Sequence, residues 1–335
     1  MINSILDPSE VEIDKEIIQY ENKLRPKTLS QIIGREKEKR SLRVMIKAAK
    51  QRDEAIDHIL FHGPPGLGKT SLAQVVANEL GVEIYATSGP ALERKGDLVS
   101  ILSNISPKGV FFIDEIHRLN KSIEEMLYSA MEDQKIDIVI GKGPSARTLK
   151  LDLNPFTVIG ATTRVGLISA PLRDRFGVLM HLDYYDYEEL RDLILQKSKA
   201  LEIKINANAA YEIAKRSRRT PRIAIRILKR VRDLASVNGK SEIDMDLCEE
   251  GLKMIEVDKH GLDNLDRKIL KTIVHSFKGG PVGLNTLAST LAEDLDTISD
   301  VYEPFLIKEG FLIRTPKGRV VTEKTLKYLQ ENEEN

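Results

Sequence analysis

The chain has 335 residues, of which 41% are hydrophobic and 30% charged, and its 51 Lys and Arg balance its 51 Asp and Glu. This length favours two or three domains with real cores, and the balanced charge argues against a protein that coats nucleic acid, so any DNA contact must be local. No stretch reaches the roughly 18–20 uncharged apolar residues of a membrane span, and the N-terminal segment Met1–Glu21 has no apolar signal core.

Residues 57–200 alternate short apolar runs with helical patterns, as βαβ units do. Ile59–Phe61 precedes a glycine-rich turn, and Ser71–Leu80 then predicts a helix. Two further apolar runs, Val110–Ile113 and Thr157–Ile159, predict buried strands of a parallel sheet that is covered on both faces. Between them, Ile136–Ile140 and Arg147–Leu151 flank Gly141–Pro144, which predicts a β-hairpin that projects over 136–151.

The remainder of the chain predicts two smaller domains. Helical periodicity dominates from Tyr187 to about Ile255, as in a small helical domain. After Asp258 the pattern is that of a winged helix, with a short hairpin around Thr315–Arg319 and helices expected at Leu265–Phe277, Leu284–Leu291 and Thr297–Glu309. We therefore expect an α/β chain with a P-loop parallel-sheet domain at 1–183, a helical domain at 184–257 and a winged-helix domain at 258–335.

Two segments concentrate positive charge. Lys215–Arg232 holds nine basic residues and no acid, and Lys308–Lys327 holds six basic residues against two acidic ones. Each run is consistent with a solvated helix face and with an anion-binding surface, and the charge count alone leaves both open.

The run Gly63-Pro64-Pro65-Gly66-Leu67-Gly68-Lys69-Thr70 matches the P-loop pattern, with a strand expected before it and a helix after it. Glycines such as Gly66 and Gly68 let successive backbone N–H groups curl toward phosphate oxygens. Lys69 is expected to reach the β and γ phosphates of ATP, and the Thr70 hydroxyl to bind Mg²⁺.

An acidic pair supplies the second half of this site. Asp114 follows the buried strand Val110–Ile113 and is placed to hold Mg²⁺ or its water. Glu115 is expected to activate the attacking water as a general base. Water attack argues against a nucleotide kinase, whose base serves a bound acceptor.

Metal chemistry other than magnesium is not expected. The only cysteine, Cys248, excludes an internal disulfide and a cysteine-built zinc site, and the six histidines, His117 among them, are scattered. A reducing cytoplasm is therefore the expected location.

These motifs together resemble the AAA+ ATPases. The resemblance implies that Thr163, in preference to Thr162, senses the γ-phosphate from the end of the third strand. It also implies that Arg175, in Pro171–Gly177, reaches the nucleotide of a neighbouring subunit, and that Arg222, in Thr220-Pro221-Arg222, closes onto the γ-phosphate.

Further motifs are similar to the RuvB family of Holliday junction branch-migration motors over about residues 20–330, among them Asp114–Leu119, Gly279–Leu284 and Arg314–Arg319. This resemblance implies a homohexameric ring on duplex DNA at a four-way junction, recruited by RuvA and joined by the resolvase RuvC. It assigns DNA binding to Arg314 and Arg319, although both are also consistent with ordinary hairpin charges. It assigns ATP binding also to Leu24, Arg25, Ser71, Glu132, Asp133, Gln134 and Tyr185.

The chain departs from the family at three positions. Arg35 stands where many relatives have Gln, Gln134 stands where an aromatic residue is expected, and Leu295 stands where a basic residue is frequent. None of the three belongs to the catalytic set.

Two other classes of function stay open at this point. A clamp loader or a replication initiator also uses an AAA+ ATPase on DNA, and a regulator could use ATP only as a switch. The helix expected at Thr297–Glu309 carries Asp300, Glu303 and Glu309 against Lys308 alone, which is poor for reading bases and disfavours an initiator. The hairpin strands carry Ile138, Ile140, Leu149 and Leu151, which are expected either to pack on the domain or to dock RuvA.

Overall fold

The computed structural model describes residues 24–140 and 147–333. Internal contacts divide the chain into two units, the first made of Met1–Gly63 and Gly68–Asp183 and the second of Pro64–Leu67 and Tyr184–Asn335. Two segments for which predictions were made, Met1–Glu21 and the hairpin turn Gly141–Pro144, lie outside the described residues. Among the residues that are described, no helix combines the length and the apolar character needed to cross a membrane.

The first unit is built on a five-stranded parallel sheet with the strand order β2-β3-β6-β1-β7. The predicted inner strands are present, and β2 and β7 were not predicted. These two lie at the sheet edges and are only partly buried, so their sequences lack the continuous apolar run that reveals an inner strand. The strands are β1 (Ile59–His62), β2 (Ile84–Ser88), β3 (Val110–Asp114), β6 (Thr157–Thr162) and β7 (Val178–His181).

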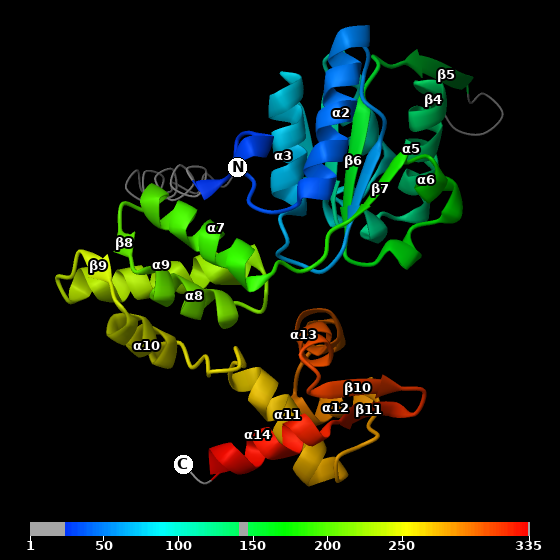
Figure 1. Cartoon of the computed structure of the whole chain (residues 1–335). Coiled ribbons are helices and arrows are strands. Elements are labelled where there is room, and N and C mark those ends of the chain that lie inside the picture. Colours follow the sequence, from blue (N-terminus) through cyan, green and yellow to red (C-terminus); the bar gives the residue numbers. More distant parts are fainter. Residues whose placement is uncertain (1–23, 141–146, 334–335) are drawn as a thin grey trace, which may run out of the picture. The chain divides into compact units, whose positions relative to one another are not determined.

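Helices cover both faces of this sheet, as the continuous apolar strands require. Figure 1 shows α2 and α3 on one side and α5 and α6 on the other. On the second side, the inner strands and the helices share one apolar cluster that includes Phe111, Leu127 and Phe176. The helices are α2 (Glu36–Arg52), α3 (Lys69–Leu80), α4 (Lys95–Ser103), α5 (Lys121–Asp133) and α6 (Ala170–Asp174).

The predicted hairpin is formed by β4 (Lys135–Ile140) and β5 (Arg147–Asp152), which pair antiparallel with Ile138 opposite Leu149. Ile136 is fully buried, and Ile138 and Leu151 pack against the core cluster of the domain. Leu149, in contrast, is 51% exposed.

The second unit begins with the predicted helical domain. It contains α7 (Tyr187–Ala200), α8 (Ala207–Lys215), α9 (Pro221–Val237) and α10 (Met245–Met254), with the short strands β8 (Lys204–Ile205) and β9 (Glu242–Ile243) paired in parallel. Two arginines of the basic run Lys215–Arg232 lie on neither a solvated helix face nor an open surface. Arg216 and Arg218 are only 4% and 6% exposed, because each forms ion pairs with two acidic residues.

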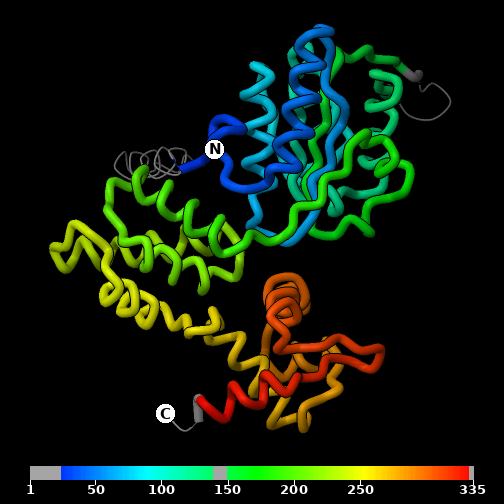
Figure 2. The backbone as a smooth tube through the Cα atoms, viewed as in Figure 1, coloured from blue at the N-terminus to red at the C-terminus, as the bar shows by residue number. Residues whose placement is uncertain are grey.

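The remainder of the second unit is the predicted winged helix, whose hairpin is seen in the backbone trace of Figure 2. The helix expected at Thr297–Glu309 is divided into a π-helical segment, η6 (Thr297–Tyr302), and α13 (Glu303–Lys308). Pro304 stands in the first turn of α13, where its missing N–H is tolerated. The other elements are α11 (Asn264–Phe277), α12 (Leu284–Leu291), β10 (Leu312–Thr315), β11 (Gly318–Val321) and α14 (Glu323–Glu333).

Candidate nucleotide and DNA sites

The P-loop leaves the end of β1 and enters α3 at Lys69. Gly63 has a φ of 139°, and a Cβ there would lie 2.2 Å from the carbonyl oxygen of Leu182, so only glycine fits. Lys69 is 8% exposed, and its Nζ donates to the carbonyl oxygen of Gly63 at 2.8 Å. The ammonium group therefore points back along the loop, where a cation can contact phosphate oxygens.

Asp114 ends β3 at the same edge of the sheet, because the carboxyl ends of parallel strands lie together. The hydroxyl of Thr70 donates to Oδ2 of Asp114 at 3.2 Å, and Oδ1 accepts from the Glu115 amide at 3.0 Å. Two neighbouring oxygen donors fit Mg²⁺, which takes one or two protein ligands together with phosphate oxygens and water. Elsewhere in the described part of the chain no group of three or more His, Cys, Asp or Glu could hold a metal ion.

Glu115 lies just beyond Asp114 in the left-handed backbone region, with a φ of 48°. Its carboxylate accepts from Arg118 at 3.1 Å, and its side chain is 48% exposed. Arg118 was not predicted as part of the site. A half-exposed carboxylate with one surface partner keeps access to water, as a general base requires.

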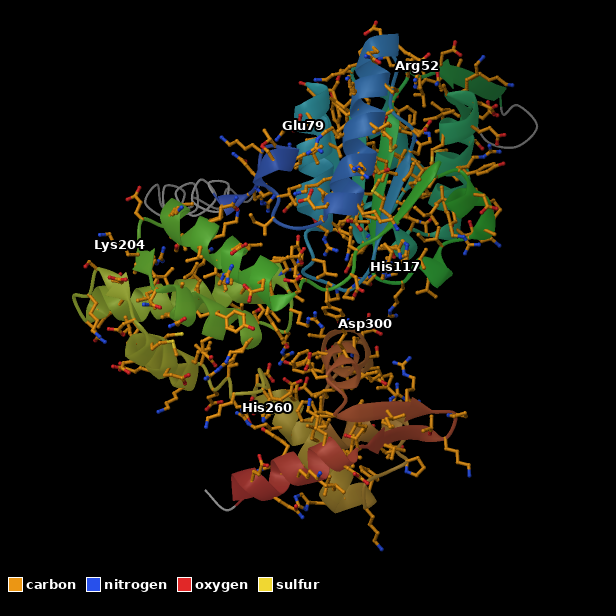
Figure 3. All side chains as sticks on the ribbon, in the orientation of Figure 1. Arg52, Glu79, His117, Lys204, His260 and Asp300 are labelled. Carbon is orange, nitrogen blue, oxygen red and sulfur yellow. The ribbon has the colours of Figure 1, made fainter. Side chains whose placement is uncertain are left out.

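The end of β6 carries both candidate sensor threonines. Thr162 is 1% exposed, and its hydroxyl forms a hydrogen bond with Nδ1 of His117 at 3.0 Å and accepts from the Arg164 amide at 2.9 Å. His117, labelled in Figure 3, thus contacts a strand end of the catalytic edge. Thr163 is half-buried and lies one residue beyond the strand.

Arg175 follows α6 and contacts two side chains of α5. It donates to the hydroxyl of Tyr128 at 2.9 Å, its guanidinium carbon lies 4.9 Å from the centre of that ring, and it pairs with the carboxylate of Glu132. The hydrogen bond with Tyr128, supported by Glu132, raises the pKa of Arg175. Sequence reasoning did not predict Tyr128, because a tyrosine inside a helical pattern carries no sign of its partner.

The other nucleotide-binding candidates of the first unit differ in how exposed they are. Leu24 is 6% exposed and Arg25 is exposed. Ser71 is half-buried in the first turn of α3. Asp133 ends α5, and Gln134 caps that helix in the left-handed conformation, next to the Glu132 that pairs with Arg175.

In the second unit, Arg222 lies in the first turn of α9, and its amide donates to the carbonyl oxygen of Gly66 at 3.3 Å. The predicted arginine is thus next to the part of the P-loop that belongs to this unit. A cavity of about 190 Å³ lies there, lined among others by Pro65, Gly66, Tyr184, Thr220, Arg222 and Tyr302.

Tyr185 and Arg219 are linked through the backbone. The Tyr185 amide donates to the Arg219 carbonyl oxygen at 3.1 Å, and Nε of Arg219 donates to the Tyr185 carbonyl oxygen at 2.9 Å. Tyr185 itself is 6% exposed. Its burial is compatible both with packing and with contact to one edge of a base.

Arg218 is a third residue that sequence reasoning missed, after Arg118 and Tyr128. It pairs with Asp263 and with the fully buried Asp266 at the start of α11, and its guanidinium carbon lies 4.9 Å and 5.2 Å from the rings of Tyr302 and Phe305. The helical domain is tied to the winged helix through this side chain.

The wing brings Arg314 and Arg319 together as cross-strand neighbours. Both donate to the carboxylate of Glu303, which is 1% exposed, while Arg314 is 56% and Arg319 only 14% exposed. Burial acts to raise the pKa of Glu303, but the two arginines outweigh it and hold that pKa below its usual value. Glu303 is therefore neutralised beneath the wing, and of the three acidic residues counted in the sequence it is the one that lies inside the domain.

Comparison with known proteins gives three matching family models in chain order. They are the Holliday junction DNA helicase RuvB P-loop domain at residues 24–182, the RuvB AAA lid domain at 185–258 and the RuvB C-terminal winged helix domain at 259–330. The chain is 54% identical to the Holliday junction branch migration complex subunit RuvB of Clostridium kluyveri over 328 residues, which are 98% of this chain and 93% of that relative.

Solved structures of RuvB from Thermotoga maritima are also similar. The structure described as the Holliday junction branch migration motor has a TM-score of 0.85 and 49% identity, and the match covers 92% of this chain and 98% of that one. A mutant of the same RuvB gives a TM-score of 0.85 and 50% identity over 91% of this chain and 98% of that one.

Proposed function

Because this chain belongs to the RuvB family, and is therefore an ATP-driven Holliday junction DNA helicase, we propose that it works as a homohexameric ring on duplex DNA. In this ring each nucleotide is held by one subunit and completed by an arginine from the next. The proposal rests on one observation, which is that the polar site residues of the first unit form two separate sets of contacts. The P-loop and Asp114 meet at the sheet edge, whereas Arg175 pairs with α5 through Tyr128 and Glu132.

The chemistry we propose is attack of water on the γ-phosphate of ATP. Lys69 neutralises charge on the β and γ phosphates, and Thr70 and Asp114 hold Mg²⁺, which lowers the charge that builds on the phosphate oxygens. Glu115 orients the water and accepts its proton. Thr163 acts as the γ-phosphate sensor, because the hydroxyl of Thr162 is committed to His117 and the Arg164 amide.

The remaining nucleotide contacts follow the family resemblance. Leu24, Arg25 and Tyr185 are proposed near the adenine, with Ser71 and Arg222 at the phosphates. Glu132, Asp133 and Gln134 are proposed to face the neighbouring subunit's nucleotide together with Arg175, since the Glu132–Arg175 ion pair places the two side chains together. At the wing we propose that Arg314 and Arg319 lie on DNA phosphates, with Lys317 exposed between them at the turn.

The partners we propose are RuvA, which recruits the ring to a four-way junction, and RuvC. Leu149 on the hairpin supports a docking surface for RuvA, because a half-exposed leucine on a projecting element can be buried by a partner. A cytoplasmic location is proposed because a motor on junction DNA must reach the chromosome.

One variant tests the hydrolytic part. Glu115→Gln should bind ATP with near-normal affinity and lose turnover by a factor of about 10² to 10⁴, since only the base is removed. ATPase should be measured on four-way junction, on linear duplex and without DNA, with RuvA present and absent. A Glu115→Gln protein with normal turnover would remove Glu115 from the role of base, and equal rates with and without DNA would argue against a DNA motor.

A further inference from the structure

Two elements of the first unit meet at Arg175. Helix α5 presents Tyr128 and Glu132 four residues apart, and therefore on one face of the helix. Arg175 reaches both from the end of α6, where the fully buried Leu172 and the buried Phe176 anchor the chain on either side of it. The backbone of this segment is thus fixed by core packing, and only the side chain of Arg175 remains to be directed.

That side chain needs support, because an arginine carries about 2 kcal/mol of rotamer entropy and acts on a phosphate only in a narrow range of positions. The side chain of Arg175 is 36% exposed, so burial alone does not hold it. Its two partners differ in kind. Glu132 offers a full negative charge, while Tyr128 offers a neutral hydroxyl acceptor and a ring face.

We propose that Tyr128 is a positioning residue for Arg175, holding its guanidinium toward the neighbouring subunit's nucleotide. This inference rests on the proposed action of Arg175 across the subunit boundary. A guanidinium has five N–H donors, so one can remain on the Tyr128 hydroxyl while others contact phosphate oxygens. Glu132 cannot serve in the same way, because its carboxylate competes with the phosphate for the same charge.

The first test is Tyr128→Phe, which keeps the ring and removes only the hydroxyl. Loss of one hydrogen bond to a charged group should lower kcat about tenfold, with KM and nucleotide affinity unchanged, because Tyr128 does not touch the nucleotide. The matched control is Tyr85→Phe in the same unit. It removes a hydroxyl whose one hydrogen is shared between two acceptors, Oε2 of Glu83 at 2.7 Å and the Asn104 carbonyl oxygen at 2.9 Å, so it should leave kcat unchanged.

The second test uses mixed rings to show in which subunit the Tyr128 hydroxyl is needed. One chain carries Lys69→Ala and contributes only its arginine, and the other carries Arg175→Ala and contributes only its nucleotide site. Tyr128→Phe is then placed in either chain. The proposal predicts loss of ATPase only when it lies in the Lys69→Ala chain, beside the intact arginine.

The possible outcomes distinguish an error in the role of Tyr128 from an error in the role of Arg175. No loss in either arrangement, or a loss when Tyr128→Phe accompanies Arg175→Ala, overturns the assignment of Tyr128. If the mixed rings without any change at Tyr128 already show no ATPase, the action of Arg175 across subunits is wrong, and the role of Tyr128 falls with it. A merely structural tyrosine would instead alter nucleotide affinity or act from both chains.

Discussion

The two wing arginines are predicted to differ when each is replaced by alanine. Arg319→Ala removes two hydrogen bonds from the buried carboxylate of Glu303, at 3.1 and 2.9 Å, whereas Arg314→Ala removes one at 2.9 Å. The control is Lys317→Ala, which removes an exposed cation at the turn between them.

The expected magnitudes follow from burial. Hydrogen bonds to a charged group contribute about 1.5–3 kcal/mol, so Arg319→Ala should lower the unfolding free energy of the winged helix by about 2–3 kcal/mol. Arg314 is 56% exposed, so solvent screens its charge although Glu303 is buried, and its loss should lower the unfolding free energy by only about 0–1 kcal/mol. Replacing both arginines leaves Glu303 buried without a cation, which should lower the unfolding free energy of the winged helix by about 3–5 kcal/mol.

The assay combines two measurements on the full-length chain. Hydrogen exchange of α11 and α12 amides reports the local unfolding free energy, and DNA titration over a salt series reports phosphate contacts. Arg314→Ala and Lys317→Ala should each reduce the log–log salt slope by about one unit with little loss of stability. Adding Glu303→Gln to Arg319→Ala should restore part of the lost stability. Unchanged hydrogen exchange in Arg319→Ala would refute the role of the buried carboxylate.

Three further outcomes are expected. Lys69→Ala should abolish nucleotide binding, measured by equilibrium titration, because it removes the buried ammonium group that we propose contacts the phosphates. Leu149→Asp should abolish RuvA binding in a pull-down while the melting temperature stays unchanged, whereas Ile136→Asp should unfold the domain, since Ile136 is 1% exposed. Burial raises the pKa of Asp266 from 3.8 to about 7 despite Arg218, so between these pH values folding takes up a proton. The winged helix should therefore lose stability as the pH rises across that interval. Asp266→Asn should reduce this pH dependence, which urea unfolding at pH 5 and pH 8 would measure.

The fold was predictable where burial leaves a mark on the sequence. The inner strand β3 is apolar from Val110 to Ile113, and the P-loop glycines carry backbone conformations that other residues rarely adopt. The edge strands β2 and β7 were missed, because half-exposed strands mix polar and apolar residues. The three RuvB family models, matched in order, decide against the clamp-loader, initiator and switch alternatives.

The site was predictable as a set of residues but not as a set of contacts. Motif spacing brought Thr70 to Asp114, because strand ends of a parallel sheet converge. No local pattern shows that Arg175 lies against Tyr128, or that Glu303 lies beneath the wing, since those pairs join segments 47 and 11 to 16 residues apart whose approach depends on packing. The two paired strands of the hairpin were predicted, but alternation of apolar and polar residues does not show which apolar side chains pack in the core.

The segment from Arg218 to Arg222 shows that amino-acid composition does not predict the surroundings of a charged residue. A count of charges treats it as part of a basic run, yet Arg218 is buried against Asp266 of the winged helix, and the Arg222 amide contacts Gly66 of the P-loop. Arg218 and Arg219 have φ values of 51° and 55°, a strained region for side chains that persists only where surrounding contacts over-determine it. One short segment thus contacts both the P-loop and the winged helix, and the two contacts share its backbone.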